Sequence, residues 1–189
     1  MNHSSEVAKS INVLYEMLTD RGIDASILKS FSQAEVANSP VFSIDIDTPK
    51  TKIVFDVSAK FKWAEVKKTL DFDPEDTDVE LVIIVVKDKV NNAEAKKIAE
   101  MNVAHQVFDL KDLQFNISHH ILVPKHELLV DEAVISKILD SLRAKKNQLP
   151  LILKTDPMAR YLNARPGNVI KVTRISPTSG EHIIYRSVV

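Results

Sequence analysis

Apolar and polar positions recur with two different spacings along this chain, and each spacing predicts one kind of element. A repeat of three to four residues is typical of a helix, whereas alternation or a short unbroken apolar run is typical of a strand. The helical spacing is found in residues 6–21, 24–37, 60–70 and 93–101, and again from about Asp131. The strand pattern is found in residues 41–46, 52–57, 80–86, 106–108, 149–153, 169–175 and 182–186.

Residues with capping or turn chemistry predict where several elements begin and end. Ser4 or Ser5 is expected to cap the first helix, and Gly22 to end it. Arg143 and the lysines that follow it are expected in the last turn of the fifth helix, where cations oppose the helix dipole. Pro150 suits the start of a strand or an edge strand. Turns are predicted at residues 38–40, 48–50 and 176–180, and an acidic loop at residues 71–78.

The order of these elements predicts an α/β (α+β) protein. Residues 80–86 include six consecutive aliphatic side chains, which fits a strand buried on both faces. With the helices and the hairpin around it, this strand predicts a mixed α/β domain over residues 1–115. The remaining helix and strands, which end in a hairpin, predict a small α/β domain with a mixed sheet over residues 116–189.

The composition narrows the class of protein without identifying it. Among 189 residues, 44% are hydrophobic and 27% are charged, as in ordinary globular proteins. The chain has no cysteine, which excludes disulfide frameworks and thiolate metal sites. No apolar run is long enough to predict a membrane span, and the first residues lack the pattern of a secretory signal. We therefore expect an intracellular protein without a membrane partner.

The net charge of −1 hides an uneven distribution. Residues 1–115 carry 20 acidic and 14 basic side chains, whereas residues 116–189 carry 6 acidic and 11 basic ones. Such asymmetry is expected of two domains with different partners, but two ordinary solvated surfaces would also produce it. Charge alone leaves both interpretations open.

Residues 156–172 combine capping, turn and strand chemistry. Asp156 and Pro157 are expected to cap and open a short polar helix. Pro166 and Gly167 favour a type II turn, because Pro fixes φ and Gly accepts a positive φ. We expect the two arginines that flank this turn to matter more for assembly than for folding. The cations of the segment are Arg160, Arg165 and Lys171.

The first predicted hairpin carries three carboxylates that invite comparison with metal-dependent nucleases. In that chemistry two acids bind Mg²⁺, and a Lys two residues after the second acid polarises the attacking water. Asp45 and Asp47 stand on one strand and Asp56 on the other. Ser58 occupies the place of the expected Lys, and Lys60 lies roughly 13 Å from Asp56 along an extended strand. The alternative interpretation is that these carboxylates are exposed charges on a hairpin and bind no metal.

Three histidines near residue 116 invite a zinc hypothesis. Neighbouring side chains on an extended segment point to opposite sides, so His119 and His120 are poorly placed to share one ion. No Cys completes a tetrahedral set, and Glu127 directly abuts His126. The alternative is a structured connector whose imidazoles bond to the backbone, and this fits a domain boundary near residue 116.

Taken together, the motifs of the second domain resemble the fifth-subunit family of eukaryotic nuclear DNA-directed RNA polymerases, which also has an archaeal form. The matching motifs occur in the family's order at residues 116–126, 148–150, 156–161, 166–172 and 176–186. The archaeal form has only this portion, so the chain is similar to the two-domain eukaryotic form. Departures in the first domain, such as Ile23 in place of an aromatic residue, indicate a divergent or virus-encoded member.

The resemblance implies a non-catalytic structural subunit without a cofactor. It implies that the second domain anchors to the largest polymerase subunit and to the small sixth subunit. The first domain would form part of the lower jaw beside downstream DNA, with a fold that resembles restriction endonucleases whose active site is lost. The residues implied at the assembly interface are His119, His120, Pro124, Lys125, His126, Asp156, Pro157, Arg160, Tyr161, Arg165, Pro166, Gly167, Lys171, Tyr185 and Arg186.

Two hypotheses from different classes follow. The first is a polymerase subunit in the nucleus (in a virion or a cytoplasmic viral factory if virus-encoded) that makes weak contacts with downstream duplex DNA. The second is a free-standing nuclease-like DNA-binding protein that uses Asp45, Asp47 and Asp56. The acidic balance of residues 1–115 argues against tight autonomous DNA binding, because phosphate neutralisation drives that affinity. The jaw lysines of the first hypothesis are Lys60, Lys62, Lys67 and Lys68.

Overall fold

The computed structural model describes residues 3–30, 40–47, 49–70, 79–176 and 180–189. It divides the chain into two compact units, Met1–Phe115 and Asn116–Val189. Each unit is built on one four-stranded sheet that mixes parallel and antiparallel pairs. The predicted α/β (α+β) class with mixed sheets is therefore confirmed.

The first unit has its strands in the order β1-β2-β3-β4. Their bounds are Val41–Asp47 for β1, Lys50–Asp56 for β2, Leu81–Val86 for β3 and Ala104–Asp109 for β4. β1 and β2 form the predicted antiparallel hairpin, and β3 and β4 continue the sheet in parallel with β2. All six residues of β3 are buried, which confirms the prediction of a strand covered on both faces.

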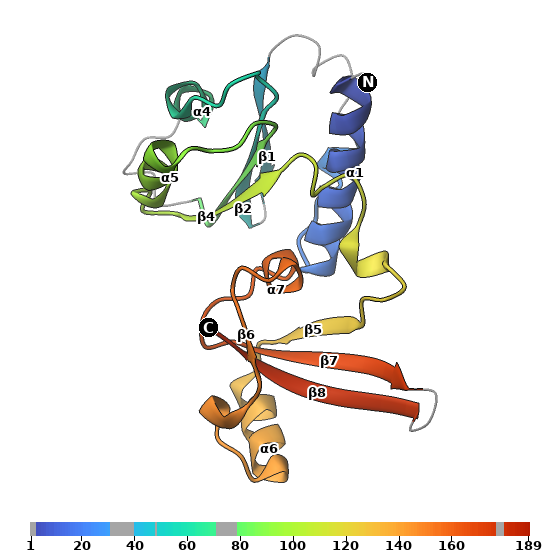
Figure 1. Ribbon diagram of the computed structural model, residues 1–189. Helices are drawn as coiled ribbons and strands as arrows, with labels where there is room; N and C mark the ends of the chain where they lie inside the picture. Colours follow the sequence, from blue (N-terminus) through green and yellow to red (C-terminus); the bar gives the residue numbers. More distant parts are fainter. Residues whose placement is uncertain (1–2, 31–39, 48, 71–78, 177–179) are drawn as a thin grey trace. The chain divides into compact units, whose positions relative to one another are not determined.

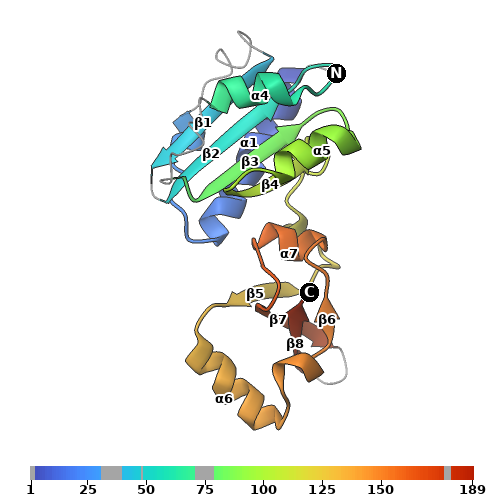
Figure 2. The ribbon, with the colours of Figure 1, turned by 90° about the vertical axis from the view of Figure 1, so that its left-hand side faces the viewer.

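Helices cover both faces of this sheet. α1 (His3–Asp20) lies against one face, and α4 (Trp63–Leu70) and α5 (Asn92–Ala99) lie against the other (Figures 1 and 2). Under α4 and α5, aliphatic side chains of the helices and strands form one hydrophobic cluster. Its buried members include Val54, Val66, Leu70, Val82, Ile84 and Ile98.

The first helix ends as its glycine predicts. Gly22 has a φ of +79°, a conformation that costs glycine little. Its N–H donates to the carbonyl of Thr19 at 2.9 Å, and the N–H of Ile23 donates to the carbonyl of Leu18 at 2.9 Å. These two bonds form a Schellman motif, so the helix end satisfies its last carbonyls locally.

The second unit has its strands in the order β5-β7-β8-β6. Their bounds are Lys125–Leu129 for β5, Leu151–Ile152 for β6, Val169–Ser176 for β7 and Gly180–Val188 for β8. β7 pairs antiparallel with β5 and β8, whereas β6 pairs in parallel with β8. The predicted C-terminal pair of strands is confirmed, and Pro150 precedes an edge strand, as expected.

Two helices pack on opposite faces of the second sheet. α6 (Glu132–Leu142) contributes Ile135 to a cluster with Val169 of β7. α7 (Pro157–Tyr161) contributes Ala159 to a cluster with Ile170 of β7. Because consecutive strand residues point to opposite faces, Val169 and Ile170 assign the two helices to different sides of the sheet (Figure 1). Two short 3-10 helices complete the unit, η1 (Ile117–His119) and η2 (Lys146–Gln148).

Several predicted helix ends were wrong. α1 begins at His3, so Ser4 and Ser5 lie inside the helix and not at its cap. α4 begins at Trp63 and not at residue 60, because the Ser58 hydroxyl bonds to the Lys60 carbonyl at 2.9 Å and bends the chain first. α5 ends at Ala99, two residues before the predicted end.

The cations predicted in the last turn of the fifth helix lie beyond it. Arg143 is the C-cap of α6 and has a left-handed conformation with φ of +50°. Lys145 precedes η2 and Lys146 begins it, so neither belongs to the helix. The strand predicted at 149–153 is reduced to β6, because its pairing with β8 stops after Leu151 and Ile152.

Some predictions fall on residues outside the described ranges. Of the helix predicted at 24–37, the structure describes a single turn, α2 (Ile27–Ser30), before residue 31. The acidic loop at 71–78 and parts of the turns at 38–40, 48–50 and 176–180 also lie outside the described residues. Within the described part of the chain, no helix combines the length and the apolar character needed to cross a membrane.

Candidate functional site

The short helix α7 begins as the sequence predicts. Asp156 is its N-cap, and one carboxylate oxygen accepts from the backbone N–H groups of Met158 and Ala159, at 2.9 and 3.4 Å. Pro157 opens the helix, where its missing N–H removes no hydrogen bond. The expectation that this helix is polar was wrong, since Met158, Ala159 and Tyr161 are all buried. α7 is therefore anchored in the core on one side.

A buried polar network ties α7 to the beginning of the second unit. Asn116 is 8% exposed, and its side-chain amide donates to the Tyr161 hydroxyl at 3.2 Å. The side-chain oxygen Oδ1 of Asn116 accepts from the N–H and the hydroxyl of Ser118, at 2.9 and 2.7 Å. Tyr161 is 5% exposed, so its buried side chain helps to fix the position of α7 in this unit.

The backbone of the turn at residues 165–168 is hydrogen-bonded to β8, the last strand of the second unit. Gly167 has a φ of +89°, and the N–H of Asn168 donates to the carbonyl of Arg165 at 2.9 Å, as a type II turn requires. The Asn168 side chain accepts from the Arg165 N–H at 2.7 Å. The N–H of Gly167 donates to the carbonyl of Val188, and the N–H of Val188 donates to the carbonyl of Asn168, each at 2.9 Å. Arg165, Pro166 and Gly167 are thus presented to solvent on a fixed backbone.

A small ion cluster crosses from β5 to β7. The strand register sets Glu127 opposite Lys171. The Glu127 carboxylate lies 2.7 Å from the Lys125 ammonium and 3.0 Å from the Lys171 ammonium. Hydrogen bonds from Lys125 and then from Lys171 lower the pKa of the Glu127 carboxyl, and partial burial opposes them. The hydrogen bond that Lys171 donates to the Glu127 carboxylate in turn raises the pKa of Lys171.

The strand register distributes the predicted interface residues over two faces of the sheet. Lys171 and Tyr185 face each other across β7 and β8, and Tyr185 packs in the cluster under α6. Lys125 stands two positions before Glu127, the partner of Lys171, so its side chain shares that face. His126 and Arg186 are one position away from Glu127 and Tyr185 along their strands, so their side chains belong to the face covered by α7. The predicted residues therefore do not form a single continuous patch on one side of the sheet.

Two of the three histidines bond to the backbone, as the connector interpretation predicts. The His126 ring nitrogen Nδ1 donates to the Pro124 carbonyl at 2.7 Å, and the Leu122 N–H donates to Nδ1 of His120 at 3.2 Å. The assumption of an extended segment was wrong at residues 117–119, which form η1. Among the described residues no group of three His, Asp or Glu side chains is placed to hold a metal ion.

The three carboxylates of the nuclease hypothesis are not brought together. Asp45 pairs with Lys52 in the hairpin register, whereas Asp56 pairs with Val41, four positions away. Four positions correspond to roughly 13 Å along a strand. Asp56 is 2% exposed, and one of its carboxylate oxygens accepts from the Ser58 N–H at 2.9 Å. Its other oxygen is buried without a hydrogen-bond partner among the described residues. Asp45 and Asp56 are too far apart to share one metal ion.

Exposed apolar side chains of the second unit are the feature that sequence reasoning missed. Hydrophobic pattern assigns such residues to strands or cores, and no local signal separates a core aliphatic from an exposed one. Ile175, for example, lies in β7 as predicted, yet it is 90% exposed. The side chains of this kind that are more than 60% exposed are Ile121, Leu122, Val130, Leu153 and Ile175.

Comparison with known proteins gives one consistent family. Residues 115–188 match the family described as RNA polymerase Rpb5, C-terminal domain. The chain is 33% identical over 155 residues to the DNA-directed RNA polymerases I, II, and III subunit rpabc1 of Dictyostelium discoideum, covering 79% of this chain and 78% of that protein. It is 52% identical over 73 residues to the DNA-directed RNA polymerase subunit Rpo5 of Metallosphaera sedula, covering 38% of this chain and 86% of that protein.

A plant relative matches a shorter stretch. The DNA-directed RNA polymerases IV and V subunit 5B of Arabidopsis thaliana is 33% identical over 107 residues, which is 57% of this chain and 49% of the plant protein. The archaeal match is about the length of the second unit alone. The Dictyostelium match, at 155 residues, is longer than either unit and therefore includes residues of both.

Proposed function

The chain belongs to the RNA polymerase Rpb5 family, as its motifs predict, and we propose that it is a non-catalytic structural subunit of a multisubunit DNA-directed RNA polymerase. In this role the second unit, Asn116–Val189, anchors the chain to the largest subunit and to the small sixth subunit. The first unit forms part of the lower jaw beside downstream DNA. The protein acts in transcription in the nucleus.

One observation carries the proposal for the second unit. The family match at residues 115–188 coincides with a compact unit of the structure, and the archaeal relative consists largely of this portion. A portion that suffices as a whole subunit in one lineage must hold the contacts that keep that subunit in its assembly. The second unit is therefore the part of this chain that we assign to anchoring.

The surface chemistry of the second unit supports this assignment. Exposed apolar side chains contribute to the affinity of a protein–protein interface, because they are removed from water on binding. Ile121, Leu122 and Ile175 are each more than 80% exposed. The excess of 11 basic over 6 acidic side chains in residues 116–189 suits an acidic partner surface, where charge sets orientation and association rate.

The assignment of the first unit to the jaw relies on four exposed lysines that would contact DNA weakly. Lys60, Lys62, Lys67 and Lys68 are exposed on and before α4, and Lys62 is paired with Glu65 at 2.9 Å. The first unit is acidic overall, so these lysines are expected to contact DNA only when the assembly holds it nearby.

The proposal is tested by recovering an affinity-tagged copy of the chain from the cells that make it and identifying its partners by mass spectrometry. We expect the large polymerase subunits to co-purify. The double variant Arg160→Glu and Arg165→Glu should lose them while it keeps the wild-type circular dichroism spectrum, because Arg160 lies on α7 and Arg165 begins the fixed turn of residues 165–168. Recovery of the wild-type chain without any polymerase subunit would contradict the proposal.

A matched control separates a specific surface from a general charge effect. Lys137→Glu combined with Lys145→Glu makes the same change of charge at exposed positions of the same unit, on α6 and before η2. This control should retain the polymerase subunits. If both double variants assemble like the wild type, Arg160 and Arg165 are not interface residues.

A further inference from the structure

The last residues of the first unit are anchored to its first helix by one side chain. The Gln114 side-chain amide donates to the carbonyl of Glu6 at 3.2 Å and to the hydroxyl of Ser10 at 3.0 Å, both on α1. It also donates to the carbonyl of Leu110 at 2.7 Å, so its two N–H groups are shared among three acceptors of this unit. Leu113, the residue before it, is 4% exposed. The chain is therefore held within the first unit as far as Gln114.

The first residue of the second unit is anchored within that unit. Asn116 is 8% exposed, and its side chain donates to the Tyr161 hydroxyl at 3.2 Å. The same side chain caps η1 by accepting from the N–H of Ser118 at 2.9 Å. The backbone carbonyl of Asn116 accepts from the N–H of His119 at 3.2 Å. Both the side chain and the backbone of Asn116 are thus bonded to the second unit.

Phe115 is the single residue between these two anchors, and its side chain is 58% exposed. Each residue contributes two soft dihedral angles to the backbone, and sterics limit a residue other than glycine to a few regions of φ and ψ. A connection of this length leaves the φ and ψ of Phe115, with the single bonds that flank it, as its free rotations. A flexible linker of many residues would instead sample a broad continuum.

We propose that Phe115 is a one-residue hinge, and that motion between the two units is confined to rotations of the backbone at this residue. Gln114 and Asn116 bound the hinge, because each fixes one of its sides within its own unit. The hinge is a property of the chain itself and does not depend on the polymerase role. If the chain is the polymerase subunit proposed above, the hinge lets the first unit turn as one body while the second unit stays anchored.

The test measures the distribution of distances between two spin labels on the full-length chain by double electron–electron resonance. The chain has no cysteine, so Lys9→Cys on α1 and Lys137→Cys on α6 place one label at an exposed helical position of each unit. The pair Lys9→Cys and Lys68→Cys lies within the first unit and gives the width that the labels contribute. Insertion of Gly-Ser-Gly-Ser after Phe115 gives the width of a flexible linker, and the wild-type distribution should be at most about half as wide.

Substitutions at Phe115 locate the rotation. Phe115→Gly should widen the distribution at least about 1.5-fold, because glycine also accepts positive φ. Phe115→Ala removes the same exposed side chain but keeps the restriction on φ and ψ, so it should match the wild type. Equal widths in the Gly and Ala variants would contradict a hinge governed by the backbone of this residue.

A second pair of variants tests the anchor on the side of the first unit. Gln114→Ala removes the anchor and lengthens the free connection, so the distribution should widen at least about 1.5-fold. The fold should lose little, because the Ser10 hydroxyl keeps its bond to the Glu6 carbonyl at 2.9 Å. Lys111→Ala, at an exposed position of the same segment, is the matched control and should leave the width unchanged. If the two variants have the same width, Gln114 does not bound the hinge.

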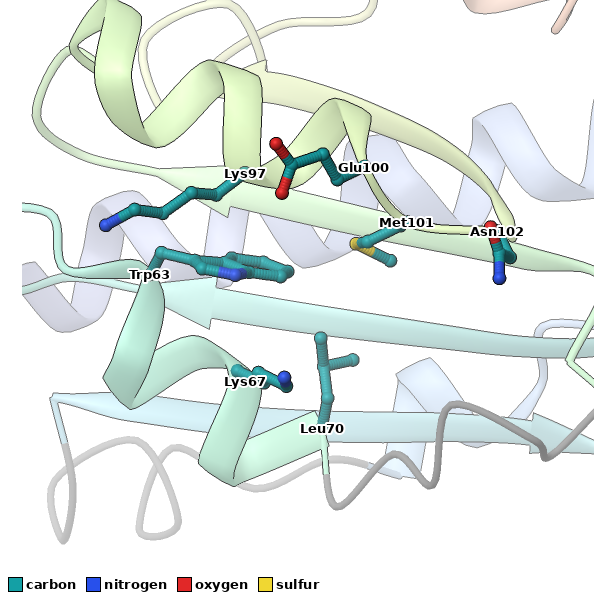
Figure 3. Close-up of a pocket in the computed structure, with 7 residues that line it drawn as sticks. All are labelled: Trp63, Lys67, Leu70, Lys97, Glu100, Met101 and Asn102. Carbon is teal, nitrogen blue, oxygen red and sulfur yellow. The ribbon is translucent and has the colours of Figure 1, made fainter.

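The fold of each variant is checked in the same samples. Trp63 is the single tryptophan of the chain and lines a groove of the first unit with Leu70 and Met101 (Figure 3), so unchanged emission shows that this unit is folded. A wild-type distribution as wide as that of the insertion variant overturns the proposal. The measurement needs no polymerase, so its outcome is independent of the co-purification that tests the proposed function.

Discussion

The side-chain amide of Asn116 donates a hydrogen bond of 3.2 Å to the hydroxyl of Tyr161, 45 positions later, and the pair is buried. This contact joins the first residue of the second unit to the helix that precedes the turn at residues 165–168. Asn116 also orders η1 through its bonds to Ser118. One polar side chain thus fixes both the start of the unit and the position of α7.

Asn116→Leu should destabilise the second unit by about 2–3 kcal/mol. The substitution keeps a similar volume but removes the hydrogen bonds of Asn116 to the Tyr161 hydroxyl and to the Ser118 N–H. Hydrogen exchange of the α7 and β7 amides measures the loss locally, which avoids assuming that the two units unfold together. Tyr161→Phe removes a single hydroxyl and should cost about 1 kcal/mol. Equal protection in Asn116→Leu and in the wild type would show that the network is not stabilising.

Asp156→Ala should cost about 1 kcal/mol, because α7 loses the acceptor for two backbone N–H groups. Asp156→Asn keeps a capping oxygen and should retain most of that stability. Asp140→Ala, at an exposed position of α6, is the control for loss of one negative charge and should be close to neutral. The three variants are compared by hydrogen exchange of α7. The cap assignment would be wrong if Asp140→Ala were as damaging as Asp156→Ala.

Gly167→Ala should destabilise the turn by about 1–2 kcal/mol, because φ is +89° and an L side chain disfavours that region. A Cβ at this position would meet no atom within 4 Å, so the cost is conformational and not steric. Asn tolerates a positive φ better, and Gly167→Asn should therefore lose less than Gly167→Ala. Thermal unfolding of both variants gives the ranking, and the reverse order would contradict a conformational origin.

Glu127→Gln should remove a pH-dependent part of the stability of the second unit. The folded-state pKa of Glu127 is lowered by Lys125 and then by Lys171. A lowered carboxyl pKa contributes stability that is fully present above the unfolded-state pKa and is lost as pH falls through the folded-state pKa. At neutral pH the variant should therefore be slightly less stable than the wild type, since the cluster is partly exposed.

The wild type and Glu127→Gln should become equally stable once the pH lies below the lowered pKa of Glu127. Denaturant unfolding of both at a series of pH values measures this, and Glu132→Gln is the control, because Glu132 is 80% exposed and lies outside the cluster. A difference between wild type and Glu127→Gln that stays constant down to acidic pH would exclude the ion cluster as its source. Added salt should narrow the difference at neutral pH.

Local chemistry made several parts of the fold and of the candidate site predictable. Asp156 with Pro157 predicted the beginning of α7, and Gly22 predicted the end of α1, because caps and glycine turns are decided within a few residues. The unbroken aliphatic run of β3 predicted burial on both faces. The ordered motifs of residues 116–186 predicted the family, which the comparisons confirm.

What the sequence by itself determined is therefore most of the elements, the caps and turns at Gly22, Asp156 and Gly167, and the family to which the chain belongs. The tertiary structure alone decided that β6 joins β8 in parallel, that Glu127 meets Lys171, and that Asn116 reaches Tyr161. It also decided which aliphatic side chains stay in water, such as Ile175. The physical reason is that strand register and helix packing depend on contacts between distant residues, and a shift of one position would move every side chain to the other face.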